Sequence, residues 1–78
     1  LDQNARFDLI LANLDTRTLD SLFPTLASRL APAGRLIVGG MLAEDEGTLT
    51  STLPSTDLHV VDRQIEADWL CLTLVAQP

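Results

Sequence analysis

The sequence predicts an α/β fold in which two parallel strands are followed by an antiparallel hairpin. Three observations lead to this prediction. A segment that is apolar apart from Asp8 stands at residues 7–12, an amphipathic helical stripe follows it, and two strand-like segments near the carboxyl end are separated only by residues 66–68. The order strand, helix, strand is typical of a parallel sheet covered by helices, whereas so short a connection favours an antiparallel hairpin.

The first predicted strand, FDLILA at residues 7–12, is apolar on both faces apart from Asp8. A run without polar alternation is typical of a strand covered on both sides. Asn13, Leu14 and Asp15 follow where this strand ends. Because ligands of open parallel sheets bind beyond the carboxyl ends of the strands, Asn13 lies where a functional side chain is expected.

A helix is predicted next, with Thr16 or Thr18 as its N-cap and Asp20 in its first turn, where the helix dipole favours an anion. Its apolar residues form one stripe at helical spacing: Leu19, Leu22, Phe23, Leu26, Ala27 and Leu30. Pro32 cannot continue the helix, and Gly34 is expected to supply the backbone freedom for the turn.

The second strand is predicted at residues 35–38, with the two glycines at 39–40 ending it. A second helix is predicted over about residues 44–53. Gly47 and the threonines in that segment have poor helix propensity, so the helical signal is weak, and Pro54 is expected to end it. Its acidic start, Glu-Asp-Glu, is expected to be a solvated helix start and no metal site, since adjacent helical residues do not face one point.

The last two strands are predicted at residues 58–65 and 69–76. Cys71 alternates with Trp69 and Thr73 and is expected to be half-buried. Trp69 is expected to pack in the core or on the sheet. His59, the only histidine, is expected to be a strand residue without catalytic partners.

Composition narrows the function classes. The 78 residues allow one small domain, and the chain does not begin with methionine, so it is expected to be a processed product or part of a longer polypeptide. A net charge of −6 without any lysine argues against nucleic-acid binding but would attract a basic protein. No apolar run approaches the ~20 residues of a membrane span. Cys71 is the only cysteine, which suits a reducing cytoplasm.

Three segments, FDLILANL, LAPAGRLIVGGML and ADWLCLTL, together resemble the carboxyl half of a class I S-adenosylmethionine-dependent methyltransferase. The combination of ANL, GGMLAE and ADWLCLTL is most similar to the PrmA type, the ribosomal protein L-eleven methyltransferases. The resemblance covers residues 7–76. It departs from the family at Ala33, where glycine is usual, at Gly39, where serine is frequent, and at residues 15–17, where small apolar residues are usual.

The resemblance implies the carboxyl half of a Rossmann-like sheet with the strand order one, two, four, three. Residues 1–78 would then be a partial methyltransferase domain that lacks the N-terminal cofactor-binding half. S-adenosylmethionine would be the cofactor of the parent enzyme only, because no Gly-x-Gly loop occurs in these residues. The chain alone is expected to be inactive.

The resemblance also implies roles for two residues. Asn13 would be catalytic, with its amide oxygen holding an N–H of an acceptor amine, and Leu14 would form part of the substrate pocket. The acceptor would be a protein such as a ribosomal protein. From position alone a second role stays open, since Asn13 or Asp15 would equally serve to cap a strand-to-helix turn.

Two other functions stay open for the chain. It could be a non-catalytic half-domain that acts as a self-association or structural module, or a nicotinamide-dependent Rossmann half, against which the terminal hairpin counts. Self-association is expected for the isolated chain. The edge of the first strand has no proline or lysine, and both helices are expected on one sheet face, which leaves apolar residues bare on the other.

Overall fold

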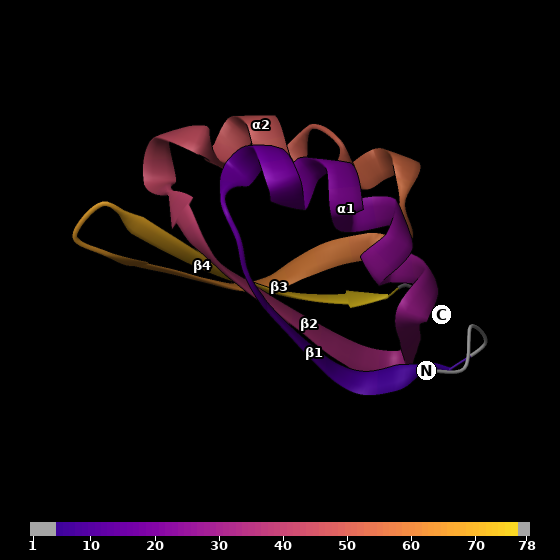
Figure 1. Ribbon diagram of the computed structural model, residues 1–78. Coiled ribbons are helices and arrows are strands. Elements are labelled where there is room, and N and C mark those ends of the chain that lie inside the picture. Colours follow the sequence, from indigo (N-terminus) through magenta and orange to yellow (C-terminus); the bar gives the residue numbers. More distant parts are fainter. Residues whose placement is uncertain (1–4, 77–78) are drawn as a thin grey trace.

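The computed structural model describes residues 5–76, which form a four-stranded sheet with its helices on one side (Figure 1). Its elements are β1 (Phe7–Asn13), α1 (Thr16–Arg29), β2 (Leu30–Leu42), the 3₁₀ helix η1 (Ala43–Asp45), α2 (Glu46–Thr50), the 3₁₀ helix η2 (Leu53–Ser55), β3 (Leu58–Glu66) and β4 (Trp69–Ala76). The spatial order is β1-β2-β4-β3, with β1 and β2 parallel and the other two pairs antiparallel. The predicted fold class and strand order are confirmed.

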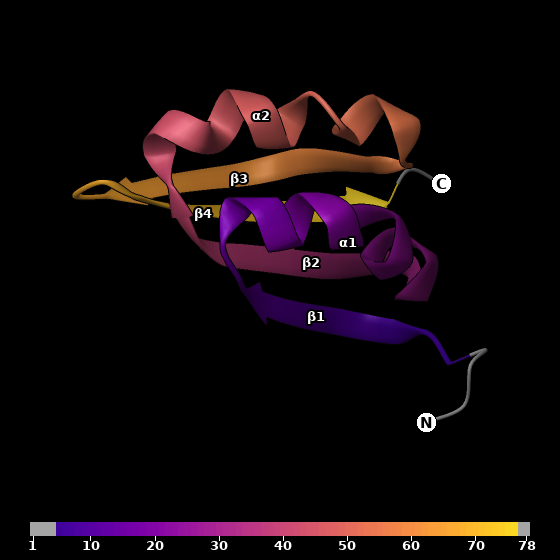
Figure 2. The same ribbon diagram turned by 45° about the horizontal axis from the view of Figure 1, so that its top comes forward.

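The hydrophobic core lies between the sheet and the helices, which cover the same face of it (Figure 2). Helix α1 buries Leu19 and Phe23 from its predicted stripe. Alternate residues of the two central strands meet them, namely Leu36, Val38, Leu70, Leu72 and Leu74. Because successive residues of a strand point to opposite faces, the other residues of these strands lie on the uncovered face.

Helix α1 begins at Thr16, and its N-cap is Asp15, so the prediction of a threonine cap is wrong. The Asp15 carboxylate accepts a 2.8 Å hydrogen bond from the backbone N–H of Thr18. An aspartate cap satisfies a free N–H and also places a negative charge at the positive end of the helix dipole. With this start Asp20 lies beyond the first turn, contrary to the prediction.

Strand β2 is much longer than the predicted residues 35–38, and the glycines at 39–40 do not end it. It continues to Leu42 because β4 pairs with it across an irregularity between Val38 and Met41. At its start Ala33, not Gly34, has the left-handed backbone, with φ of 64°. Gly34 is needed for space instead, since a Cβ there would lie 2.8 Å from the carbonyl oxygen of Ala31.

The second helix is shorter than predicted. Helix α2 has five residues, and separate 3₁₀ turns flank it, with Pro54 inside the second of them. The hydroxyls of Thr50, Ser51 and Ser55 each donate to a backbone carbonyl three or four residues earlier. Such bonds compete with a regular helix, which accounts for the broken segment.

The predicted hairpin is confirmed. Strand β4 has the expected bounds, β3 extends one residue further than expected, and a two-residue turn with Ala67 at φ of 54° joins them. Cys71 is half-buried, as expected. Within residues 5–76, no helix is both long and apolar enough to cross a membrane.

Candidate functional site

The candidate site lies at the carboxyl ends of the two parallel strands. Asn13, the last residue of β1, pairs with Gly39 of β2. The backbone N–H of Leu14 then donates a 3.0 Å hydrogen bond to the Gly39 carbonyl oxygen, so the chain stays attached to β2 as it leaves the sheet. This end of a parallel pair is where open α/β sheets bind their ligands.

The Asn13 side chain packs directly on the backbone of Gly40. Gly40 has φ of +86°, and a Cβ at this position would collide with Asn13 Oδ1 and lie 3.1 Å from the Leu14 carbonyl oxygen. Glycine is therefore required at position 40 for both its backbone angle and its lack of a side chain. The contact holds the Asn13 amide in a defined place at the strand end.

Within residues 5–76, the exposed Asn13 side chain forms no hydrogen bond with another residue. The cap of α1 is supplied by Asp15 instead. The amide of Asn13 is thus free to bind a ligand, and its catalytic role stays a prediction. Leu14 is partly buried against the core, and its predicted contact with a substrate also stays a prediction.

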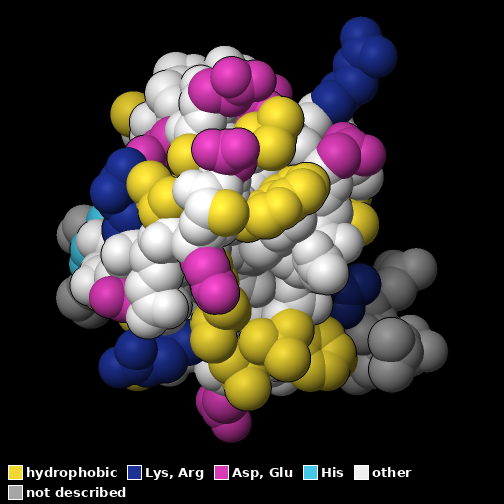
Figure 3. Space-filling model, turned by 90° about the vertical axis from the view of Figure 1, so that its left-hand side faces the viewer, with side chains coloured by type: hydrophobic (Ala, Val, Ile, Leu, Met, Phe, Trp, Pro, Cys, Tyr) yellow, Lys and Arg dark blue, Asp and Glu magenta, His cyan; other side chains and the backbone are white. Residues whose placement is uncertain are grey.

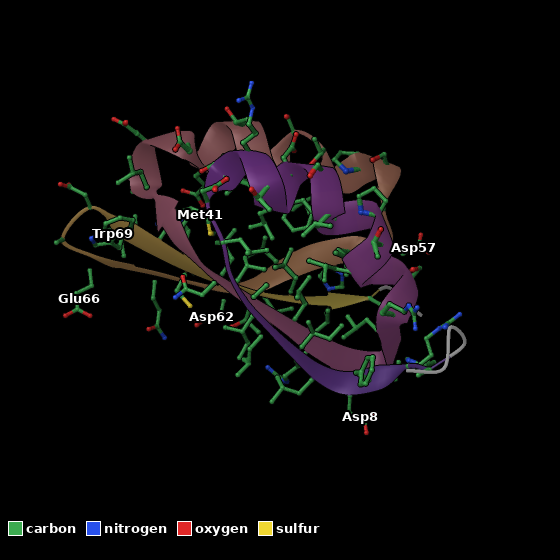
Figure 4. All side chains as sticks on the ribbon, in the orientation of Figure 1. Asp8, Met41, Asp57, Asp62, Glu66 and Trp69 are labelled. Carbon is green, nitrogen blue, oxygen red and sulfur yellow. The ribbon has the colours of Figure 1, made fainter. Side chains whose placement is uncertain are left out.

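A shallow hollow of about 510 Å³ lies beside Gly40. Trp69 and Leu42 form its apolar part, and Asp15, Thr16, Arg17 and Asp45 bring polar groups to it. Trp69 is 57% exposed, so of the two expected places for it, the core and the sheet, the core is excluded. Figure 4 shows Trp69 near the hairpin end of the molecule, far from Asp57. Sequence spacing gave no signal for the hollow, because its residues come from α1, β2, η1 and β4.

Hydrogen bonds fix the acidic groups around the hollow. Thr16 Oγ1 donates to Asp45 Oδ2 at 3.0 Å, which joins the start of α1 to η1. The backbone N–H of Thr18 holds the pKa of Asp15 below its usual value. Nearby, the hydrogen bond from Arg63 lowers the pKa of Glu46, and the two side chains form an ion pair at 2.6 Å. The carboxyl groups of Asp15 and Glu46 are therefore ionised at neutral pH.

A second hollow, of about 450 Å³, lies at the opposite end of the parallel strands. Pro24, Leu30, Leu58 and Ala76 are among the residues that line it, and Asp57 is its one ionisable side chain among the described residues. Amino ends of parallel strands do not form the ligand crevice of such sheets. Across residues 5–76, no group of three or more His, Cys, Asp or Glu side chains is placed to hold a metal ion.

Comparison with known proteins identifies the family. The model of the family described as "Ribosomal protein L11 methyltransferase (PrmA)" matches residues 1–77. The chain belongs to the PrmA family. A ribosomal protein L11 methyltransferase of Geotalea uraniireducens is 37% identical over 71 residues, which are 91% of this chain and 22% of that protein. The one from Chloroflexus aurantiacus is 37% identical over 68 residues, 87% of this chain and 21% of that protein.

Solved structures agree with the PrmA assignment. A crystal structure of a ribosomal protein L11 methylase from Lactobacillus delbrueckii subsp. bulgaricus superimposes with a TM-score of 0.89 at 25% identity. The superposition covers 99% of this chain and 40% of the methylase chain. The crystal structure of M1.HpyAVI has a TM-score of 0.73 at 17% identity, which shows a shared fold. The chain spans about a fifth of the length of the curated PrmA relatives. The family assignment confirms the predicted resemblance to the carboxyl part of a methyltransferase.

Proposed function

We propose that this chain is the carboxyl-terminal part of an S-adenosylmethionine-dependent methyltransferase that methylates an amine nitrogen of a protein. Ribosomal protein L11, which gives the relatives their name, is the proposed acceptor. The observation that carries the proposal is the Asn13 amide, which is exposed and held against Gly40 at the carboxyl end of β1. Because Cys71 is a free thiol, we place the parent enzyme in a reducing compartment, the cytoplasm.

Asn13 suits an amine acceptor chemically. Its amide oxygen accepts one N–H of the neutral amine, and this bond fixes the direction of the nitrogen lone pair. In a displacement reaction, such alignment and proximity supply much of the rate enhancement. S-adenosylmethionine would supply the electrophilic methyl group. Residues 1–78 contain no Gly-x-Gly sequence, so we assign none of them to the cofactor.

A chimeric enzyme tests this function. The matching segment of the Geotalea uraniireducens relative is replaced by this chain, and transfer of labelled methyl groups to ribosomal protein L11 is measured. We expect activity, and we expect Asn13→Ala to lower turnover about 100-fold without weakening cofactor binding, since Asn13 acts on the acceptor. Asp57→Asn, at the opposite end of the parallel strands, is the control and should retain turnover. Full activity of the Asn13→Ala chimera would leave Asn13 as a turn residue only.

A second function, self-association of the isolated chain, rests on the uncovered sheet face. Leu9 and Leu11 lie on this face of β1 with 55% and 69% of their surface exposed. Hydrophobic side chains gather on this side of the molecule, near the lower edge of Figure 3. Among the described strands β1 pairs only with β2, so its outer edge has open N–H and C=O groups.

We propose that a protein of these 78 residues alone forms a homodimer or larger assembly through this edge and face. Sedimentation equilibrium at micromolar concentration measures the mass. The wild-type chain should exceed the monomer mass of 8.5 kDa, and Leu11→Glu should shift it toward monomer. Thr25→Glu, at an exposed position of α1 on the helical side of the sheet, is the control and should leave the mass unchanged. A wild-type monomer would refute this proposal.

A further inference from the structure

Strand β3 forms the second open edge of the sheet. Among the described strands it pairs only with β4, so one side of its backbone has no strand partner. Residues 61–66 are all exposed, and Val61 and Ile65 have 48% and 44% of their surface exposed. An open edge of this kind is a template for the addition of a strand from another chain.

The register shows which backbone groups of β3 face outward. On the β2 side of the hairpin, the Ala43 N–H donates to the Asp68 carbonyl oxygen at 2.8 Å. Because bonded and non-bonded residues alternate in an antiparallel ladder, the next residue, Trp69, directs its N–H and C=O groups to the other side, toward Glu66. The same alternation along β3 points the N–H and C=O groups of Ile65 away from β4, where an added strand would bind them.

The two sides of this edge differ in chemistry. On the helical side, a hollow of about 550 Å³ adjoins the first part of β3. The apolar residues that line this hollow are Leu53, Pro54, Leu58 and Val60. On the other side, the carboxylates of Asp62 and Glu66 point away from the helices (Figure 4). The charge of Arg63 is already paired with Glu46, so the carboxylates keep this side of the edge acidic.

We propose that the β3 edge binds an extended segment of a basic partner protein as an additional strand of the sheet. Successive side chains of such a segment point to opposite sides, so apolar residues would enter the hollow and basic residues would lie beside Asp62 and Glu66 in alternation. A bulge between Val60 and Asp62 interrupts the edge, so regular pairing is expected along residues 62–66, and the next residues of the segment would meet the hollow.

Charge decides in favour of a basic partner over a second copy of this chain. Two β3 edges paired with each other would bring the carboxylates of Asp62 and Glu66 close to those of the other copy, and like charges across a strand pair are destabilising. A basic segment meets the same carboxylates with opposite charge, and the net charge of −6 of the whole chain attracts it. Neither step depends on Asn13 or on methyl transfer.

Binding is tested by backbone amide NMR on the full chain. The probe is an acetylated and amidated octapeptide in which lysine and valine alternate, and the control is the octapeptide in which glutamate and valine alternate. We expect the lysine peptide to shift the Ile65 amide resonance and to slow its hydrogen exchange, because this N–H gains a partner. The glutamate peptide should bind at least about fivefold more weakly.

Two N-methylated forms of the lysine peptide test the main-chain pairing. One form has methyl groups on the valine nitrogens, and the other has them on the lysine nitrogens. Since the N–H groups of alternate residues point to the same side of a strand, only one form keeps its donors toward β3. We expect that form to bind within about twofold of the unmodified peptide and the other at least about tenfold more weakly. Equal binding of the two forms would overturn the proposal.

Variants of the chain locate the site. Ile65→Pro removes an outward N–H at an edge position where proline is tolerated, and it should weaken binding at least about fivefold, whereas Ile65→Thr keeps this N–H and should bind within about twofold of wild type. Glu66→Gln should weaken binding about twofold or more. Asp8→Asn, on β1 at the opposite edge of the sheet, is the charge-matched control and should not. If Ile65→Pro unfolds the chain, the N-methylated peptides decide alone.

Two results would assign the edge to another occupant. Amide shifts confined to β1 would place strand addition at the other edge of the sheet and overturn the proposal. A mass that exceeds the monomer in sedimentation equilibrium and falls in Ile65→Pro, but not in Ile65→Thr, would show that a second copy of the chain occupies the β3 edge, which would also overturn it.

Discussion

Replacing Gly40 with alanine tests the geometry on which the candidate site depends. The backbone of Gly40 has φ of +86°, and an added Cβ would collide with Asn13 Oδ1 while lying 3.1 Å and 3.2 Å from the backbone oxygen and nitrogen of Leu14. Gly39 is the matched control, because a Cβ at that position meets nothing within 4 Å. Of the described glycines, Gly40 alone has a positive φ.

The magnitude follows from two costs. A left-handed backbone costs an L-residue about 1–2 kcal/mol, and displacing packed neighbours costs about 1–3 kcal/mol more. Alanine at position 39 avoids both costs, and the gain of about 0.4–1 kcal/mol from the reduced entropy of the unfolded chain applies to both variants and cancels in their difference. We therefore expect the two variants to differ by roughly 2–5 kcal/mol in free energy of unfolding, a large part of the roughly 4–12 kcal/mol available to a domain of this size.

Urea denaturation at one fixed protein concentration measures this difference, because any self-association makes the midpoint concentration-dependent. With a slope of about 1 kcal/mol per molar urea for so small a domain, the midpoints should be separated by at least about 2 M. In the chimera, Gly40→Ala should also lower turnover, since the added methyl group moves the Asn13 amide. Equal midpoints for the two glycine variants would refute the Asn13–Gly40 packing.

Three further predictions concern other parts of the chain. Ala33→Gly should raise the free energy of unfolding by about 0.5–1 kcal/mol in urea denaturation, because alanine has φ of 64° there. A stability loss would contradict that backbone angle. Asp15→Ala should destabilise the chain at neutral pH while Asp15→Asn keeps the cap. Because folding lowers the pKa of Asp15 below 3.8, the ionic part of this stabilisation is present above that pH and is lost as the pH falls through the lower folded-state pKa. A difference between Asp15→Asn and wild type that grows toward low pH would contradict this sign. Isothermal titration should detect no binding of S-adenosylmethionine to the isolated chain, and a micromolar dissociation constant, about −8 kcal/mol, would refute that expectation.

The sequence by itself determined the elements and their order. Apolar runs without alternation, one helical stripe ending before Pro32, and a short link between the last two runs each have a local cause, so pattern was enough to identify them. The position of Asn13 at a strand end followed from the same local pattern. The motifs of residues 7–76 also identified the family, which the family model then matched over residues 1–77.

Element boundaries were decided by contacts between distant residues. Strand β2 passes through Gly39 and Gly40 because β4 pairs with it, and no local signal encodes that pairing. The choice of Asp15 over two nearby threonines as helix cap depended on where the chain leaves β1. These differences of a few residues decide that the Asp15 side chain caps α1 and that the Asn13 amide stays available to bind a ligand.

The surroundings of the site were decided by tertiary structure alone. Asn13 meets Gly40 only because two parallel strands end together, and Trp69 meets Asp15 and Asp45 only because the hairpin extends past that end. These residues are up to 56 positions apart in the sequence, from Asn13 to Trp69, and no periodicity relates them. Local sequence specifies which backbone shape each segment prefers, whereas the side chains that share one hollow are specified by strand register and helix packing.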